Sequence, residues 1–311
     1  MKKRILTIGS ANMDFVMNVQ QIPLAGQTIS DPGSYRFIPG GKSANSAVAV
    51  SRLGGESIFC TRLGNDANGA ALRAIYNKEK LDTRFVTTDP TTPTGLAAIM
   101  VEPSGQNRII VFPGSNDRIC RDDIESAMLS RPDALLMQME IPADAVITAA
   151  GFASQKDIPI IIDAGPAKKN FPLDRLPKLK IFSPNETETE TFTGITPDSP
   201  ENCLRAAMAL SRLVDAEYYV IKLGDRGCYI YDGKYYHCLP AYDTHVVDTT
   251  AAGDAFTAAL ALEYLRSGDI VRAGKFANAV GAITVSSVGA LPSIPTESDV
   301  AQFLRNTGEK L

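Results

Sequence analysis

The most informative stretch of this sequence runs from Val247 to Phe256 (VDTTAAGDAF) and passes from a strand-like apolar run into an alanine-rich helix. It places the small residues Ala251, Ala252 and Gly253 at the expected start of that helix. The first N–H groups of a helix have no partner within it, and the helix dipole adds positive charge beside them. Such a turn predicts an anion site suited to a phosphoryl group on which charge develops.

Asp254 follows directly, in the first turn of the same predicted helix. Beside an anion site, its carboxylate can accept a proton from an attacking hydroxyl. An isolated aspartate at a helix start more often stabilises its own helix through the dipole. The surrounding small residues change that balance, and we expect Asp254 to act as the base of a phosphoryl transfer.

The elements that would position these residues follow an α/β pattern, because short apolar runs alternate with helical periods along most of the chain. Strands are expected at Arg4–Ile8, Ile58–Leu63, Ala134–Gln138, Pro159–Asp163, Lys180–Ser183 and Tyr218–Leu223. Helices are expected at Ser43–Leu53, Gly69–Lys80, Arg121–Ser130, Ala143–Gln155, Glu201–Leu213, Ala252–Arg266, Ile270–Ser286 and Glu297–Arg305. This alternation predicts a mainly parallel sheet covered by helices.

Two stretches interrupt that order. Val16–Pro39 has no helical period and contains prolines and glycines, whereas Gly95–Phe112 consists of two apolar runs around the turn-rich Glu102–Asn107. The second stretch predicts a hairpin. We expect a single domain spanning residues 1–311, with a small β-rich lid built from segments at about 16–39 and 95–112. Surface strands without a role in binding are an equally good interpretation of the pattern alone.

Composition excludes several classes of function. The formal net charge is −4 and the basic residues are scattered, so we expect neither a nucleic-acid nor a membrane partner. The five cysteines are odd in number and never form a C-x-x-C pair, and there are only two histidines, which argues against a disulfide framework or a zinc site. No apolar run approaches the length of a membrane helix. The basic residues at the N-terminus precede a first strand rather than a leader, so we expect a cytoplasmic protein.

A second motif lies about two hundred residues upstream of the first, at Pro39–Ala49 (PGGKSANSAVA), where a glycine pair precedes a helix. The two motifs together, in this order, resemble the signatures of the ribokinase-like (PfkB) carbohydrate kinases. The resemblance covers essentially the whole chain. It implies a three-layer α/β sandwich with a mainly parallel sheet and a β-rich lid, and ATP-dependent phosphorylation of a sugar. The terminal hydroxyl of a pentose such as D-ribose is the expected acceptor, and a nucleoside, a fructose-type ketose or a keto-deoxy sugar acid is the alternative.

The resemblance also implies a set of sugar ligands. They correspond here to Asn12, Asp14, Gly41, Lys42, Asn45 and Glu140. Carboxylates and amides at strand ends can hold vicinal hydroxyls by paired hydrogen bonds, and strand ends are where α/β sheets bind ligands. From the residues alone, Asn12 and Asp14 are more typical of a turn.

On the nucleotide side, the resemblance implies ATP with Mg²⁺. The Asn-x-x-Glu motif corresponds to Asn185 and Glu188, where the glutamate would orient Mg²⁺ through water, although from the residues alone an acidic first helical turn is the preferred explanation of Glu188. The remaining nucleotide contacts correspond to Lys222, Gly224, Asp225, Gly227, Gly253 and Asn278. Two residues depart from the family pattern: Lys222 replaces the usual threonine, and Ser43 replaces the usual glycine after Lys42.

The resemblance further implies a monovalent cation, K⁺, beside the anion site, and a homodimer formed through the lid. The cation positions correspond to Asp248, Thr250, Thr284, Ser287, Gly289 and Ser293. A polar loop that caps a helix is a fair alternative explanation of Thr284 and Ser287. Two other classes of function remain as alternatives. One is a sugar or nucleotide sensor without catalysis, and the other is a dinucleotide-dependent dehydrogenase, which the lack of G-x-G-x-x-G after the first strand disfavours.

Overall fold

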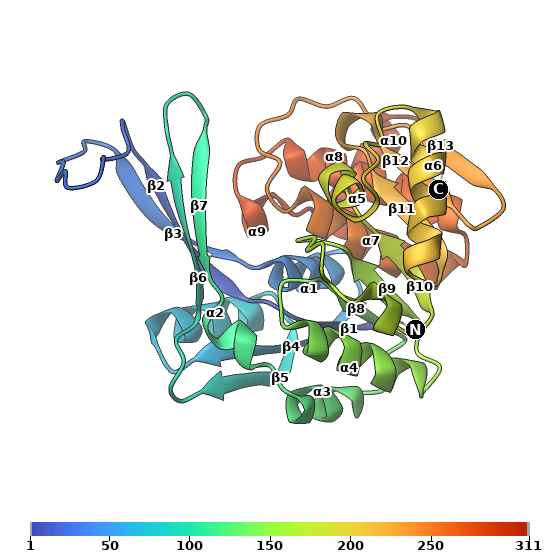
Figure 1. Cartoon of the computed structure of the whole chain (residues 1–311), viewed down its shortest axis with the longest axis horizontal. Helices are drawn as coiled ribbons and strands as arrows, with labels where there is room; N and C mark the ends of the chain where they lie inside the picture. The colour runs from blue at the N-terminus through green and yellow to red at the C-terminus, as the bar shows by residue number, and fades with distance from the viewer. Residues whose placement is uncertain (1, 310–311) are drawn as a thin grey trace.

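The structure is a computed structural model that describes residues 2–309. Its central sheet has the strand order β13-β12-β11-β10-β9-β8-β1-β4-β5 (Figure 1). The strands are β1 (Arg4–Ile8), β4 (Glu56–Gly64), β5 (Asp82–Asp89), β8 (Ala134–Met137), β9 (Ile160–Asp163), β10 (Leu179–Ser183), β11 (Ala216–Lys222), β12 (Cys228–Tyr231) and β13 (Tyr236–Leu239). All neighbours are parallel except for β12, which is antiparallel to both β11 and β13. The six predicted strands are confirmed, with ends within two residues of the prediction.

Helices cover both faces of this sheet, which explains why its central strands are apolar throughout rather than alternating. One face packs against α1 (Lys42–Arg52), α2 (Ala67–Lys78), α7 (Ala252–Ser267), α8 (Ile270–Val285) and α10 (Glu297–Asn306). The other packs against α3 (Arg121–Met128), α4 (Ala143–Ser154), α5 (Glu186–Thr193) and α6 (Pro200–Leu213). Along β1, Ile5 joins the first core while Leu6 and Ile8 join the second. The predicted three-layer α/β sandwich is confirmed.

Helix α7 lies in the centre of the first core, against α1 and α8. Every residue from Asp254 to Glu263 is buried, and the segment has no polar face that would turn toward solvent. Its many alanines allow α1, α8 and the sheet to approach closely. The helix that carries the predicted anion site is therefore held by the core, and its N-terminus lies near the carboxyl ends of the parallel strands.

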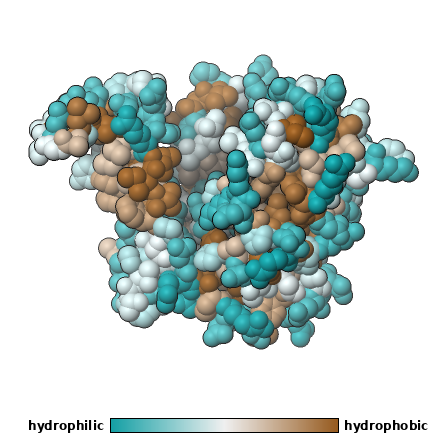
Figure 2. Space-filling view, viewed as in Figure 1, coloured by the Kyte–Doolittle hydropathy of each residue, from teal (hydrophilic) through white to brown (hydrophobic). Residues whose placement is uncertain are grey.

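A separate sheet of four strands forms the lid, in the order β3-β2-β6-β7. It comprises β2 (Asn12–Asn18), β3 (Ser34–Gly40), β6 (Gly95–Val101) and β7 (Asn107–Phe112), and it projects from the body (Figure 1). The predicted hairpin is confirmed by the antiparallel pairing of β6 with β7. Figure 2 shows apolar side chains on the lid and a hollow between the lid and the body.

The lid starts earlier than predicted, because β2 begins at Asn12 instead of near Val16. Asn12 and Asp14 are strand residues and do not form a turn. Several further elements escaped prediction: β5, β12, β13, α5, α9 (Ala290–Ser293) and the short 3-10 helix η1 (Gly114–Arg118). Across residues 2–309, the helices are all too short or too polar to cross a membrane.

Candidate active site

The predicted anion site lies at the start of α7. Ala251 precedes α7 in the left-handed conformation (φ 63°), which is uncommon for a residue other than glycine, and no side chain caps the helix. Apart from its neighbours in the chain, the described atoms within 4 Å of a Cβ built at Gly253 are Nζ and Cε of Lys222, at 3.8 and 3.9 Å. The Ala252 N–H donates to the Thr249 carbonyl oxygen at 3.3 Å, and Ala252 and Gly253 in the first turn of α7 line an open cavity that an anion can fill.

Asp254 is buried beside this turn, with 6% of its surface exposed. Its Oδ2 accepts a hydrogen bond from Asn45 Nδ2 at 2.8 Å, and Lys42 Nζ lies 4.0 Å from its Oδ1. Burial raises the pKa of Asp254 to about 6, against the opposing effects of Lys42 and Asn45. The same charge pairing raises the pKa of Lys42. A carboxylate that titrates just below neutral pH is well suited to general-base catalysis.

The start of α1 is fixed by backbone geometry around Gly41. Gly41 has φ 93°, and a Cβ there would come 2.8 Å from Ala11 Cα. Glu140 Oε2 accepts hydrogen bonds from the Lys42 amide at 3.1 Å and from Ser10 Oγ at 2.5 Å. Glu140 thus holds the glycine-pair turn through one carboxylate oxygen.

The departure at position 43 is accommodated by neighbouring residues. Ser43 lies inside α1, so the position needs no positive φ, and its Oγ donates to Gln138 Oε1 at 2.5 Å. Gln138 Nε2 in turn donates to Ser46 Oγ, which donates to the Asp254 carbonyl oxygen at 3.1 Å. A side chain at Gly9 would overlap Ser43 Oγ. This buried chain of hydrogen bonds links α1 and β8 to α7.

On the lid side, Asp14 carries an Oδ1 that is buried and has no hydrogen-bond partner. Its carboxylate lies against Gly40, where an added Cβ would come within 2.1 Å of Oδ2. Burial, together with the nearby Glu140 and Asp254, raises the pKa of Asp14 to about 7. Asn45 likewise has a buried Oδ1 without a partner. Both oxygens are free to accept hydrogen bonds from a bound molecule.

Asn12, by contrast, has a protein partner. Its Oδ1 accepts from Asn116 Nδ2 at 2.7 Å, and Asn116 Oδ1 accepts from the Ala11 amide at 2.9 Å. Asn116 lies in η1, far away in sequence, and no sequence signal marked it. The amide group of Asn12 keeps its own N–H donors for a ligand.

A cavity of about 470 Å³ lies on the other side of the α7 N-terminus. Its floor is the loop from Lys222 to Gly227, where Gly224 and Gly227 have φ 57° and 88°. The predicted nucleotide contacts that line it are Lys222, Gly224, Asp225, Gly227, Gly253 and Asn278. The side-chain amide of Asn278 donates to the carbonyl oxygens of Leu239 and Pro240, so it also holds the wall of the cavity in place. The volume falls in the usual range of small-molecule sites.

Asn185 and Glu188 form a capping box at the start of α5. Asn185 Oδ1 accepts from the Glu188 amide at 2.8 Å, and Glu188 Oε2 accepts from the Asn185 amide at 2.7 Å. The structural role considered for Glu188 is therefore present. Glu188 is also buried, which raises the pKa of its carboxyl against the effect of Lys222, and its Oε1 faces Gly165 rather than a donor. This second oxygen can serve as an acceptor for water on a hard cation.

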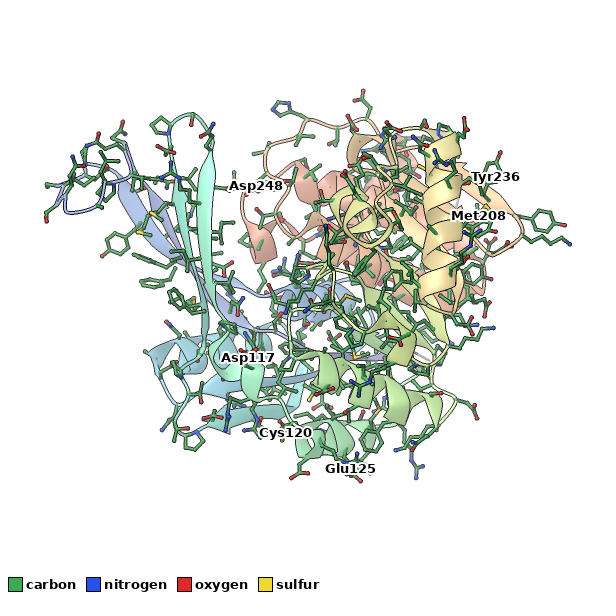
Figure 3. All side chains as sticks on the ribbon, in the orientation of Figure 1. Asp117, Cys120, Glu125, Met208, Tyr236 and Asp248 are labelled. Atoms are coloured by element: carbon green, nitrogen blue, oxygen red, sulfur yellow. The ribbon has the colours of Figure 1, made fainter. Side chains whose placement is uncertain are left out.

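The predicted cation positions lie on adjoining loops. Asp248 Oδ1 accepts from the amide and hydroxyl of Thr250, and its Oδ2 accepts from the Gly289 amide at 2.8 Å. Burial alone would raise the pKa of Asp248, but these hydrogen bonds hold it below its usual value. Figure 3 labels Asp248 on the side of the body that faces the lid. Thr284 and Ser293 bond to nearby backbone carbonyls in their own helices, and the Ser287 amide donates to the Thr284 carbonyl.

Sequence reasoning missed a buried ion pair at the centre of the site. Lys222 Nζ lies 2.6 Å from Asp163 Oδ1, at the carboxyl end of β9. Thr257 donates from Oγ1 to Asp163 Oδ2 at 2.7 Å. The available signal was an aspartate that directly follows three isoleucines, since a polar residue at the end of a buried parallel strand faces the ligand edge of the sheet.

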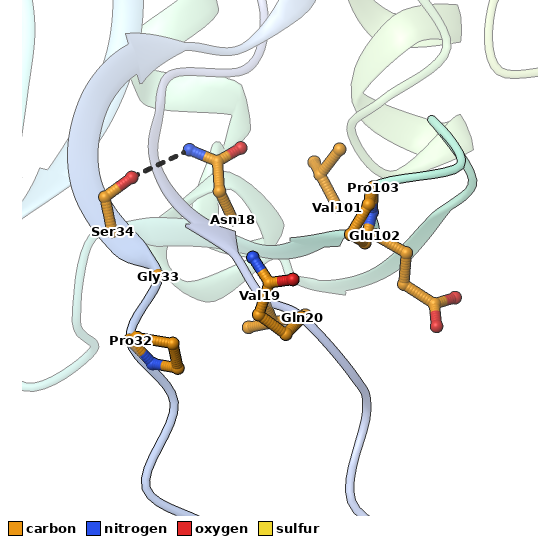
Figure 4. A pocket seen from close by; sticks show the side chains of 9 residues that line it. All are labelled: Asn18, Val19, Gln20, Pro32, Gly33, Ser34, Val101, Glu102 and Pro103. Atoms are coloured by element: carbon orange, nitrogen blue, oxygen red, sulfur yellow. Dashed lines mark hydrogen bonds between the residues drawn. The ribbon is translucent and has the colours of Figure 1, made fainter.

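A second cavity, of about 430 Å³, lies at the far end of the lid (Figure 4). Asn18 and Ser34 are joined across it by a hydrogen bond of 3.1 Å, and Glu102 is its one ionisable lining residue. It contains none of the predicted site residues. Within the described part of the chain, no three His, Cys, Asp or Glu side chains gather as a metal site would require.

Comparison with known proteins agrees with this geometry. The sequence pattern of the family described as "pfkB family carbohydrate kinase" matches residues 2–297. The chain is 30% identical to a ribokinase of Haemophilus influenzae over 98% of its own length and 100% of that protein. It is also 30% identical to a deoxyribokinase of Salmonella typhi, over 96% of its own length and 98% of that protein.

Among solved structures, a ribokinase of Arabidopsis thaliana in complex with ribose and ATP superimposes with a TM-score of 0.91. The two sequences are 30% identical, and the match covers 98% of this chain and 99% of the other. The lid, the sheet and the α7 N-terminus therefore belong to one shared architecture.

Proposed function

This chain belongs to the pfkB family of carbohydrate kinases, and from that premise we propose that it transfers the γ-phosphoryl group of ATP to the terminal hydroxyl of D-ribose. One observation carries the proposal. The buried carboxylate of Asp254 lies in the uncapped first turn of α7 on one side, and on the other it accepts a hydrogen bond from Asn45, whose Oδ1 is unpartnered like that of Asp14. A phosphoryl donor fits on the first side and a polyol on the second.

The sugar is held by side chains from three elements. Asp14 Oδ1 and Asn45 Oδ1 accept hydrogen bonds from sugar hydroxyls, which supplies the partners that these buried atoms lack. Asn12 donates through its free N–H groups, and Glu140 accepts through the oxygen that does not bind the Lys42 amide. Several fixed acceptors favour a substrate with vicinal hydroxyls.

Asp254 takes the proton of the attacking hydroxyl as the new O–P bond forms, and the bond from the γ-phosphorus to the bridging oxygen of ATP breaks to release ADP. The N–H groups of Ala251, Ala252 and Gly253 stabilise the charge on the transferring phosphoryl oxygens. The loop from Lys222 to Gly227 forms the floor beneath the nucleotide. Lid strands above the sugar exclude water and limit hydrolysis of ATP.

Mg²⁺ and K⁺ fit the residues on either side of this turn. Glu188 holds the Asn185 amide through Oε2 while its Oε1 faces Gly165, which suits an outer-shell contact with hydrated Mg²⁺. Asp248 supplies a negative charge for K⁺, with backbone carbonyls of Thr284 and Ser287 and the adjacent Thr250, Gly289 and Ser293 as further ligands. Bound Mg²⁺ neutralises charge on the phosphates, and bound K⁺ stabilises the loop before α7.

The substrate is tested with a panel of acceptors in a coupled assay of ADP release. The panel contains D-ribose, 2-deoxy-D-ribose, D-fructose, a nucleoside and a keto-deoxy sugar acid, each with and without K⁺. We expect the highest kcat/KM for D-ribose. A 2-deoxy sugar leaves one buried polar group unpaired and should lose about tenfold or more. Fast turnover of another acceptor with none of D-ribose refutes the assignment.

We also propose that the protein is a homodimer joined through the lid. The outer lid strands β3 and β7 expose large apolar side chains, namely Tyr35, Phe37, Ile109, Ile110, Val111 and Phe112. They lie along the two opposite edges of the lid sheet, and exposed apolar side chains in such number are typical of a protein interface. Light scattering at assay concentration should give the dimer mass, and the double variant Phe37→Asp/Ile110→Asp should give the monomer mass. A monomeric wild-type protein at that concentration contradicts the proposal.

A further inference from the structure

Asp163, Lys222 and Thr257 form a buried polar cluster beneath the first turn of α7. They come from the carboxyl ends of β9 and β11 and from α7 itself. Lys222 Nζ and Asp163 Oδ1 are 2.6 Å apart, and Thr257 Oγ1 donates to the other carboxylate oxygen at 2.7 Å. Lys222 is 9% exposed, Asp163 is 3% exposed and Thr257 is fully buried. Few charged side chains are buried to this degree unless they are paired.

The ammonium group of Lys222 already has protein partners for its three donors. Besides Asp163, Nζ reaches the Ser183 carbonyl oxygen at 3.1 Å and Thr257 Oγ1 at 3.4 Å. A lysine ammonium has three N–H groups and no acceptor. Although Lys222 borders the nucleotide cavity, this saturation gives it a task other than donating to phosphate.

These contacts join three strand ends to one helix turn. Ser183 ends β10, so β9, β10 and β11 all meet at the cluster. Thr257 Oγ1 also lies 3.0 Å from the carbonyl oxygen of Gly253, one turn earlier in α7. This turn needs such support, because it has no side-chain cap and follows Ala251 in a strained left-handed conformation. Uncapped first turns otherwise fray.

We propose that Asp163, Lys222 and Thr257 are positioning residues that fix the first turn of α7, and with it Asp254 and the anion site, for phosphoryl transfer. The inference rests on the proposed role of that turn. The pair has no net charge, so it supports the turn without adding a charge beside the phosphates. Loss of the support leaves binding of ATP and sugar largely intact but misplaces the reacting groups, which lowers kcat.

The first test uses Thr257, because its variants disturb no charge. Thr257→Val removes the hydroxyl at nearly constant shape, and Thr257→Ser retains it. We expect Thr257→Val to lower kcat by about tenfold with KM for ATP and sugar within about threefold, whereas Thr257→Ser stays within about twofold of wild type in kcat. Wild-type kcat in Thr257→Val, or an equal loss in both variants, overturns the proposal.

The second test separates positioning from mere charge pairing. Lys222→Met leaves a buried unpaired carboxylate and should lower both Tm and kcat. The double variant Asp163→Asn/Lys222→Met removes both charges, so Tm should recover to within a few degrees of wild type while kcat stays at least about tenfold low. Recovery of kcat together with Tm shows a purely structural pair and refutes the proposal.

Two controls complete the design. Lys180→Met breaks an ion pair with Glu217 between the same strands, β10 and β11, but at their amino ends, and it should leave kcat unchanged. Asp254→Asn is assayed in parallel. An active Asp254→Asn enzyme refutes the proposed base itself, whereas an inactive one beside a fully active Thr257→Val variant refutes only the positioning role.

Discussion

Removal of the charge of Lys42 should move the pH profile of the enzyme to higher pH. Lys42 Nζ lies 4.0 Å from Asp254 Oδ1 and opposes the effect of burial, which raises the pKa of Asp254 to about 6. At that distance, and at an effective dielectric constant of about 20, a unit charge contributes about 4 kcal/mol. One pKa unit corresponds to about 1.4 kcal/mol, so the Coulomb interaction sets a ceiling of about three units. In Lys42→Met we expect a rise of at least about one unit.

The direction of this shift in the pH profile follows from the role of Asp254 as the base. A base must be ionised, so kcat/KM falls as the pH drops through the pKa of this group. With a pKa of about 6, about nine-tenths of Asp254 is ionised at pH 7, and with a pKa near 8 only about one-tenth is. For a rise of about two units, Lys42→Met should therefore lose about tenfold in activity at pH 7 and regain most of it at pH 9.

The assay is kcat/KM for the sugar, measured between pH 5 and pH 9.5 at saturating ATP and Mg²⁺. Lys42→Arg is the matched control, because it keeps the positive charge and should keep the acid limb near pH 6. The reasoning is wrong if Lys42→Met loses activity by the same factor at every pH. It is also wrong if its acid limb does not move.

Three further predictions follow from the site. Burial and neighbouring carboxylates raise the pKa of Asp14 to about 7, so the stability that this residue contributes at low pH is lost as the pH rises through 7. In denaturant titrations, Asp14→Asn should therefore raise the free energy of unfolding by about 2 kcal/mol more at pH 8.5 than at pH 5. An equal change at both pH values argues against the raised pKa. In Gly253→Ala, the new methyl group contacts the end of the Lys222 side chain, so Tm should stay the same or rise slightly. The methyl group also occupies the anion site and should lower kcat by about tenfold or more. An unchanged kcat would show that the anion lies elsewhere. Glu188→Gln should raise the Mg²⁺ concentration that gives the half-maximal rate several-fold. Glu186 lies in the same helical turn but is paired with Arg226, so Glu186→Gln should leave this concentration unchanged. Equal responses of the two variants would remove Glu188 from the Mg²⁺ site.

Much of the fold could be predicted from the sequence because its strands and helices carry local sequence patterns. Buried parallel strands such as Ile160–Asp163 are continuous apolar runs, and α7 combines small residues with a clear helical start. Strand β5 (Asp82–Asp89) escaped because it lies at the edge of the sheet and is largely polar. Strands β12 (CYIY) and β13 (YHCL) escaped because neither forms the continuous aliphatic run that marks β9.

The site could be predicted only in part from the sequence, because its other residues are brought together by contacts between distant parts of the chain. Asn116 holds Asn12 from 104 positions away, and Thr257 meets Asp163 across 94. Lys222 was noted as a departure from the family pattern, but its partner Asp163 lies in a different strand and could not be paired with it from sequence. The structure also shows Ser43 as a helix residue bonded to Gln138, a question that sequence left open.

The assignment of Asp254 as the base is tested most directly by the transfer of labelled γ-phosphate from ATP to D-ribose in a single turnover at pH 8. The rates of wild type and Asp254→Asn are compared, and the ATP affinity of both proteins is measured by calorimetry. We predict that Asp254→Asn slows transfer by about 10² to 10⁴-fold while the Kd for ATP stays within about threefold. Transfer at the wild-type rate by the variant would contradict the assignment of Asp254 as the base.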